Sequence, residues 1–171
     1  MRRQVRPALL LAWLLASVPL WLVIASDRAL PIYRSLWFIA HTVSAALGAG
    51  ALAVAGIIGI LYLAALSAPS VASRLPALAT LDAAAYMLLR LGFPWMTLSL
   101  VMGSIWAQLT WGTLWNWEMR ETWALIAWLL FLLCQHVRDI PGWAGKRMAF
   151  VAAAALLITL LALASARFLY T

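Results

Sequence analysis

The sequence predicts an all-α integral membrane protein that forms a single transmembrane domain over residues 1–171. Two numbers carry this prediction: 67% of the residues are hydrophobic and 10% are charged. A soluble domain is nearer half apolar and a quarter charged. So few charges cannot cover a globular surface, and the mean hydropathy of +0.98 fits a chain whose surface is covered by lipid.

Five apolar segments predict about five membrane-spanning helices. A perpendicular crossing needs about 20 apolar residues. The segment 36–66 exceeds that length, so we expect it to tilt or to project beyond the lipid. The first segment could also be a signal peptide cleaved after Ala25, but its length and its tryptophans favour an uncleaved span. The predicted spans lie near 8–25, 36–66, 87–108, 122–137 and 148–168.

The basic residues predict the orientation. The net charge is +7, and the basic residues lie at the ends of apolar segments, as the positive-inside rule expects. This distribution excludes a nucleic-acid partner and favours an inside N-terminus and an outside C-terminus in the bacterial inner (cytoplasmic) membrane. The inside face would carry Arg2, Arg3, Arg6, Arg74, Arg90, Arg138, Lys146 and Arg147, and the outside face Arg28, Arg34, Arg120 and Arg167.

Small residues and connectors complete the predicted architecture. The stretch 67–85 is expected to be an irregular connector leading into a short amphipathic segment, and 139–147 a tight turn. The single cysteine, Cys134, excludes an intramolecular disulfide. In the second span, four glycines are spaced so that neighbouring helices can pack closely; these are Gly48, Gly50, Gly56 and Gly59.

The external segment 109–123 has two interpretations. Tryptophans concentrate at membrane interfaces, and such a belt accounts for Trp13, Trp21, Trp37, Trp95, Trp128 and Trp143. Crowding of Trp111, Trp115, Trp117 and Trp123 into one connector instead favours a platform for a flat ligand. If the connector is helical, Trp111, Trp115 and Glu118 share one face. Haem could stack on such indoles while its propionates pair with Arg120. Composition alone leaves both interpretations open.

The chain has two histidines, His41 and His136. An ionisable residue at membrane depth indicates a functional site by default, and imidazole is the usual ligand of haem iron. The alternative is a neutral histidine that bonds a neighbouring helix. His41 is predicted on the side of the tryptophan segment and His136 at the inner end of the fourth span, so the two cannot ligate one haem.

The segment WGTLWNWEMRETWALIAW resembles the tryptophan-rich WWD motif of the cytochrome c assembly family, which includes CcsA- and ResC-type haem-handling proteins. The flanking segments extend the resemblance to about residues 30–168. LPIYRSLWFIAHTV resembles the stretch around an external haem-ligand histidine, which places His41 there. LDAAAYMLLRLGFPWMTLSLVMGSIWAQLTWG resembles the helix that leads into the motif. CQHVR resembles the family's transmembrane histidine, which His136 matches.

The chain also departs from the family pattern. Glu118 takes the place of the motif aspartate, and Arg120 that of the usual lysine. The family has a second external histidine beyond the last span, whereas this sequence ends at ARFLYT before that place and would supply one external ligand. Typical members also have several more N-terminal spans. A partner for the transmembrane histidine would come from another subunit.

The resemblance implies a non-covalent haem b, handled and presented on the outer face for c-type cytochrome maturation. His41 would ligate the iron, and His136 would mark a second haem site. The residues that would contact the macrocycle or its propionates are Trp111, Trp115, Trp117, Arg120 and Trp123. No catalytic residue is predicted, because the chain would be part of a cytochrome c synthase or haem lyase system.

The partners implied are a CcsB-like membrane subunit or another membrane complex, apocytochrome c and the lipid bilayer. Two alternatives use the same fold. The chain could be a haem-free structural or assembly subunit of a larger membrane complex, or a small regulator that resembles the HemX branch of the family.

Overall fold

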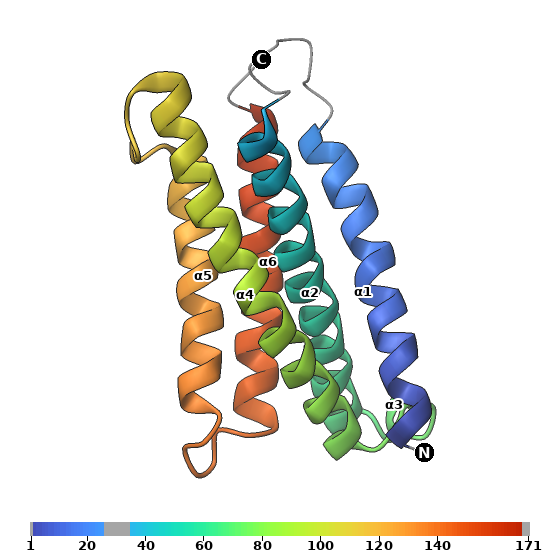
Figure 1. Cartoon of the computed structure of the whole chain (residues 1–171). Coiled ribbons are helices and arrows are strands. Elements are labelled where there is room, and N and C mark those ends of the chain that lie inside the picture. Colours follow the sequence, from blue (N-terminus) through green and yellow to red (C-terminus); the bar gives the residue numbers. More distant parts are fainter. Residues whose placement is uncertain (1, 26–34, 169–171) are drawn as a thin grey trace.

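The structure, a computed structural model, describes residues 2–25 and 35–168, with side chains described over 7–19 and 35–161. Within these ranges the chain is all helical, without strands, which confirms the predicted fold class. Five long helices run up and down, with one short helix between the second and the next (Figure 1). They are α1 (Arg2–Ala25), α2 (Leu36–Ser67), α3 (Pro69–Ala72), α4 (Leu78–Trp111), α5 (Met119–Val137) and α6 (Lys146–Phe168).

The long helices match the predicted spans, with one difference in length. The stretch 67–85 is not an irregular connector throughout, because α4 already begins at Leu78. By length and composition, α2 and α4 are the two described helices that could cross a membrane. They contain 32 and 34 residues, so each is about 50 Å long and extends beyond a hydrocarbon core of about 30 Å. The five-span topology remains a prediction.

The connectors separate the two ends of the bundle. The turns around α3 and between α5 and α6 lie at one end, and the connector 112–118 lies at the other (Figure 1). Arg138 and Lys146 belong to the first end and Arg120 to the second, as the predicted charge distribution requires. Arg28 and Arg34, which were assigned to the outer face, lie outside the described residues.

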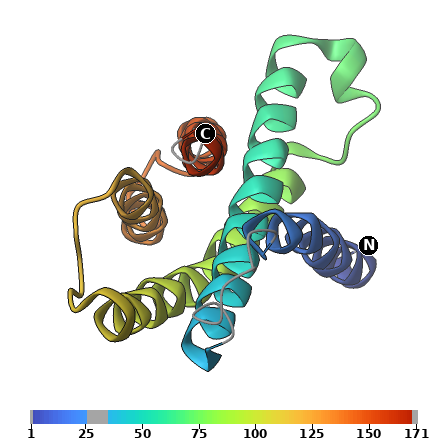
Figure 2. The same ribbon diagram turned by 90° about the horizontal axis from the view of Figure 1, so that it is seen from above.

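Helix α2 lies at the centre of the bundle and contacts α1, α4 and α6 (Figures 1 and 2). Its glycines make these contacts close, as predicted. A Cβ on Gly48 would lie 3.1 Å from the backbone nitrogen of Met96 in α4, and one on Gly59 would lie 2.7 Å from the carbonyl oxygen of Ala149 in α6. Gly50 faces Ser17 of α1 in the same way. One helix therefore packs against three neighbours because small residues occur on each of its faces.

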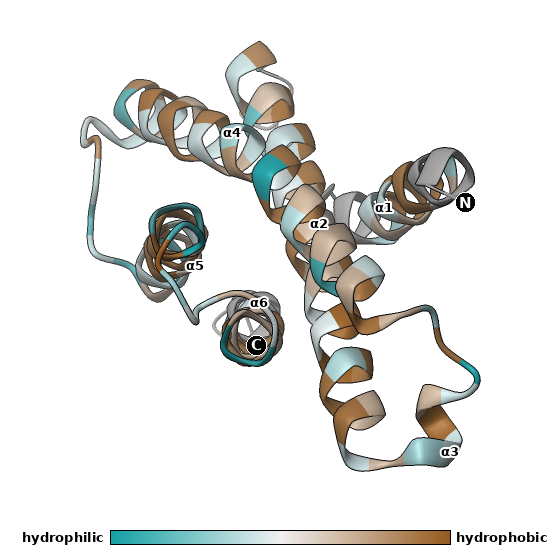
Figure 3. Ribbon diagram, turned by 90° about the horizontal axis from the view of Figure 1, so that it is seen from below, coloured by the Kyte–Doolittle hydropathy of each residue, from teal (hydrophilic) through white to brown (hydrophobic). Residues whose placement is uncertain are grey.

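The outward faces of the helices are apolar, as lipid contact requires. On α6, Phe150, Leu157 and Leu160 are 55%, 59% and 53% exposed. Figure 3 shows apolar residues along α2 and α4 and hydrophilic residues at the near ends of α5 and α6. A helix with apolar residues on both its packed and its exposed faces is typical of a membrane environment.

Two tryptophans assigned to a membrane-interface belt bond to neighbouring helices; Trp13 is buried inside the bundle, so that interpretation was wrong for it, whereas Trp128 is half-buried. The ring of Trp13 is 8% exposed, and its Nε1–H donates to the carbonyl of Leu47 at 2.7 Å. In α5, Trp128 donates from Nε1 to the hydroxyl of Thr97 at 2.8 Å. Both indoles satisfy their N–H on a neighbouring helix rather than in interfacial water, because helix packing brings an acceptor within reach.

A charged clamp, formed by Arg138 and Asp82, lies at the end of the bundle that carries the α5–α6 turn. Arg138, just after α5, donates two hydrogen bonds to the carboxylate of Asp82 in α4, at 2.8 and 2.6 Å. The backbone N–H of Gly145 donates to the same carboxylate at 2.9 Å, and the guanidinium lies 4.6 Å from the ring centre of Tyr86. The hydrogen bond to Asp82 raises the pKa of Arg138 further above its ordinary value. This bidentate pair ties α4 to α5 and to the α5–α6 turn.

Replacing Asp82 by alanine should leave Arg138 and the Gly145 N–H without this acceptor. We expect D82A to lower the free energy of unfolding by about 1.5–3 kcal/mol, the range for hydrogen bonds to charged groups. The measurement is chemical denaturation in detergent followed by circular dichroism. Arg90→Ala is the control, because Arg90 is exposed and makes only a 5.9 Å contact with the Tyr86 ring. Equal losses in both variants would show that the clamp contributes nothing specific.

Candidate functional site

The connector between α4 and α5 is not helical, which corrects the predicted shared face of Trp111, Trp115 and Glu118. Helix α4 ends at Trp111 because Gly112 adopts the left-handed conformation with φ 79°. Helical structure resumes only at Met119. Residues 112–118 therefore form an irregular loop in which each indole is oriented separately.

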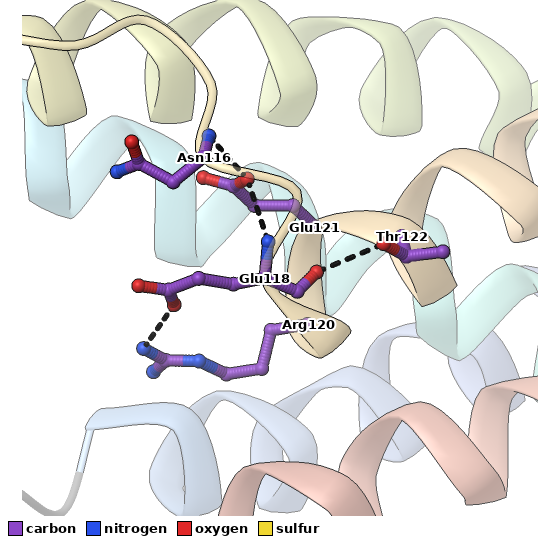
Figure 4. A network of polar contacts seen from close by, with 5 residues as sticks. All are labelled: Asn116, Glu118, Arg120, Glu121 and Thr122. Carbon is purple, nitrogen blue, oxygen red and sulfur yellow. Dashed lines mark hydrogen bonds and ion pairs between the residues drawn. The ribbon is translucent and has the colours of Figure 1, made fainter.

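Local hydrogen bonds hold this loop in place (Figure 4). One carboxylate oxygen of Glu121 accepts from the backbone N–H of Asn116 at 2.8 Å and from that of Glu118 at 3.2 Å. Thr122 donates from its hydroxyl to the carbonyl of Glu118 at 3.0 Å. Glu118 and Glu121 thus fix the start of α5, since a helix leaves its first N–H groups without internal partners.

Arg120 lies beside this loop and pairs with Glu118, with 3.3 Å between the guanidinium nitrogen and the carboxylate oxygen. The two side chains are 38% and 45% exposed. An exposed ion pair of this kind contributes little stability, so Arg120 can exchange Glu118 for another anion at small cost.

The indoles divide into two groups. Trp111 packs edge-on against Trp106, with 4.7 Å between ring centres, and Trp106 lies 5.0 Å from Phe38 of α2. Trp115 and Trp117 form a second edge-on pair at 5.9 Å in the loop itself. Trp123, near the start of α5, is half-buried. The first group continues the packing between α2 and α4, whereas the second lies on the loop beyond it.

Two features of the loop pair indicate a surface built for contact. Trp117 is 72% exposed and has φ 57°, a left-handed conformation that costs a non-glycine residue about 1–3 kcal/mol. Trp115 has the opposite character: its Nε1 is buried and makes no hydrogen bond within the described part of the chain. Such an atom needs an explanation, and an acceptor on a bound molecule or partner would satisfy it.

His41 lies in α2 with its ring against α4. Its Nδ1 is 2.9 Å from the carbonyl oxygen of Ser99 and 3.2 Å from the Ser99 hydroxyl. A carbonyl oxygen can only accept, so Nδ1 carries the proton. In the neutral ring, Nε2 then holds the lone pair. A hydrogen bond from one ring nitrogen to a carbonyl is the usual way in which a metal-ligating histidine is oriented.

Helix packing brings His41 toward the tryptophan segment. Phe38 lies one turn before His41 on α2, and Ser99 and Trp106 lie on one face of α4, two turns apart. The bond from His41 to Ser99 and the packing of Phe38 on Trp106 are therefore two separate contacts between α2 and α4, and Trp111 extends the second toward the loop. Sequence analysis missed Phe38, Ser99 and Trp106, although their helical spacing from His41 and Trp111 was a usable signal.

His136 lies at the other end of the molecule, near the last residue of α5. It is exposed, and its Nδ1 is 2.9 Å from the Leu132 carbonyl of its own helix. The structure thus places His41 and His136 apart, as predicted. Among the described residues, no group of three histidine, cysteine or acidic side chains could hold a metal ion.

Comparison with known sequences agrees with this arrangement. The family described as cytochrome C assembly protein matches residues 5–171. The chain belongs to the cytochrome c assembly protein family. The matched region includes His41, the tryptophan loop and His136, so the candidate site lies within the part of the chain that the family covers.

Curated relatives match part of the chain. It is 44% identical over 87 residues to the cytochrome c biogenesis protein CcsA of a Picosynechococcus species, covering 50% of this chain and 26% of the relative. The CcsA proteins of Marchantia polymorpha and a Synechococcus species are each 47% identical, over 72 and 79 residues, covering 42% and 46% of this chain. These matches cover 22% and 23% of the two relatives. The aligned part is therefore about a quarter of each relative.

We expect Glu121→Ala to loosen the connector, because it removes the acceptor of the Asn116 and Glu118 N–H groups. The loss should be about 1 kcal/mol, as for other helix N-terminal acceptors. Amide exchange over residues 112–120, followed by mass spectrometry, should then accelerate about fivefold. The control is Asp139→Asn, an exposed acid at the opposite end. Unchanged exchange in E121A would contradict the assigned role.

Proposed function

We propose that this chain holds haem at the outer end of the α2–α4 pair and presents it for c-type cytochrome maturation. The observation that carries the proposal is the orientation of His41. Its Nδ1–H donates to Ser99, which leaves the Nε2 lone pair to ligate iron. The family assignment supports the role, since curated relatives carry the name cytochrome c biogenesis protein.

The residues of the tryptophan loop supply groups that a porphyrin could use. Trp111, Trp115, Trp117 and Trp123 offer aromatic surface against which the macrocycle can stack. Arg120 is a half-exposed cation in a weak ion pair and can pair with a propionate. The unbonded Nε1 of Trp115 can donate to an acceptor on the ligand. The site thus combines one metal ligand, an apolar wall and a cation.

The chain's own part in the reaction is to bind and to orient. When bound, haem supplies the reactive vinyl groups, which join to thiols of the acceptor protein. His41 would hold the iron, the indoles would pack against the ring and Arg120 would pair with a propionate. In this proposal the chain is one part of a synthase or haem lyase system.

The proposed setting follows the predicted topology. Five spans with an inside N-terminus would place the tryptophan loop and His41 on the outer side of a bacterial inner membrane. Relatives occur in plants as well as bacteria, so the family itself fits more than one membrane.

A CcsB-like subunit and apocytochrome c are the proposed partners, and either could supply a second iron ligand. His136, exposed at the inner end, is proposed as a second haem site completed by another subunit.

A haem-free structural role is the competing proposal, and one observation favours it. Trp106, Trp111 and Phe38 pack on one another between α2 and α4, so part of the aromatic cluster has a use in stability alone. In that case the chain would serve as an assembly subunit of a larger membrane complex. The two proposals differ in whether purified protein retains haem.

Purified protein in detergent should give a b-type pyridine haemochrome spectrum. His41→Ala should abolish this signal, because it removes the iron ligand of the tryptophan site. His136→Ala should retain the signal of the outer site, since that residue lies at the opposite end of the bundle. Wild-type protein that carries no haem, even when purified with its natural partners, would favour the structural role.

Trp115→Ala or Trp117→Ala should reduce haem retention while membrane insertion stays intact. These rings lie on the loop rather than in the helix packing, and loss of an aromatic contact costs about 0.5–1.5 kcal/mol, or roughly a 2- to 12-fold weaker affinity. Haem per protein, measured by the ratio of Soret to protein absorbance, is the readout. Trp143→Ala, in the α5–α6 turn, is the matched control. Equal losses at all three positions would indicate a general effect on stability.

A further inference from the structure

We propose that Gly103 and the main-chain carbonyl of Ser99 are positioning elements that set the ring orientation and the tautomer of His41. The inference rests on the proposed function, because it concerns the residue that would ligate iron. It goes further by assigning two residues of α4 that act through His41 without touching the ligand.

The first step concerns the Ser99 carbonyl. Within an α-helix, the carbonyl of residue 99 faces the N–H of residue 103, so one of its two lone pairs serves the helix. The second lone pair can accept a hydrogen bond from another helix only if the neighbouring side chains of α4 leave room for the donor. In this helix the second bond comes from His41 Nδ1, at 2.9 Å.

The second step concerns Gly103, whose side chain would cover that carbonyl. A Cβ added there would lie 2.7 Å from Nδ1 and 2.9 Å from Cε1 of His41, both shorter than real contacts allow. The imidazole therefore occupies the space that any other residue at position 103 would fill. Glycine is required for close approach, not for an unusual backbone conformation.

The third step is that α2 and α4 are in close contact on both sides of His41. Gly48, two helical turns along α2 from His41, packs against the backbone of Met96, where a Cβ would lie 3.1 Å from the nitrogen. Phe38, one turn on the other side, contacts Trp106. Separating the helices would lose both flanking contacts, so we expect a methyl group at position 103 to displace the ring instead.

Displacement of the ring has a chemical consequence. The carbonyl forces the proton onto Nδ1 and reserves Nε2 for a metal, and the hydrogen bond makes the imidazole a stronger ligand. The Ser99 hydroxyl, 3.2 Å from Nδ1, is a second and longer contact. Removing the hydroxyl leaves the main-chain acceptor, so Ser99→Ala should have a much smaller effect than Gly103→Ala.

The tautomer can be measured on this chain, residues 1–171, without haem. Nitrogen-15 labelling of histidine gives signals from two rings, and His136→Ala identifies those of His41. We expect the His41 ring to be protonated on Nδ1 in the wild type and in S99A. In G103A we expect a mixture of tautomers or protonation on Nε2. If Gly103 had a merely structural role, a G103A variant with an unchanged circular dichroism spectrum would also keep the wild-type tautomer.

Haem affinity gives the second readout. Loss of a partner that orients a metal ligand weakens binding by about 10- to 100-fold, so G103A should raise the haem dissociation constant by that factor. The reduction potential of haem bound to G103A should be more positive than that of haem bound to the wild type, since a weaker imidazole donor stabilises ferric iron less. Ser104→Ala is the control on the same helix, because its hydroxyl donates to its own backbone at Leu100 and does not serve His41.

The outcomes separate this inference from the proposed function. Protonation of wild-type His41 on Nε2 would overturn the inference whether or not haem binds. This measurement uses the wild-type protein, so it does not depend on whether a variant folds. An unchanged tautomer and affinity in folded G103A would overturn it as well. An Nδ1–H tautomer that G103A removes supports the positioning role even if the wild type binds no haem, in which case only the proposed function fails.

Discussion

The close approach of α2 to α4 is the contact on which the proposed site depends. Lipid is as apolar as a leucine side chain, so burial alone does not hold membrane helices together. Small residues and interhelical hydrogen bonds must do so. Gly48 brings the α2 backbone against Met96, and two turns away His41 reaches the carbonyl of Ser99 at 2.9 Å. The hydrogen bond that orients the imidazole is therefore a product of the same packing that holds the bundle together.

The two ends of the bundle are stabilised in different ways. At the end that carries the α5–α6 turn, Arg138 and Asp82 are separated by 56 residues in sequence, so their bidentate pair fixes tertiary structure. At the end that carries the connector 112–118, Glu121 bonds the N–H groups of residues three and five positions earlier, so this network fixes only a loop. A loop held mainly by exposed local contacts opens at lower free energy than an end held by a bidentate ion pair.

The tryptophans serve more than one purpose, and burial separates them. Trp13 and Trp128 donate to neighbouring helices and act as packing residues. Trp106 and Trp111 extend the α2–α4 contact to the outer end, while Trp117 carries both high exposure and a strained backbone. Strain in a non-glycine residue persists only where the surroundings over-determine it. The connector carries the tryptophan whose conformation is not explained by the stability of the fold alone.

The sequence by itself determined the helical class, the approximate ends of the five long helices, the close-packing glycines of α2 and the family. These follow from composition, apolar run length and a local motif, all of which act over neighbouring residues. Tertiary structure alone decided that Trp13 is buried, that Trp128 bonds Thr97, and that His41 bonds Ser99, 58 positions away. A helix period shows which residues share a face, but not which face of another helix lies opposite. That choice depends on the packing of whole helices, and it places Gly103 beside His41.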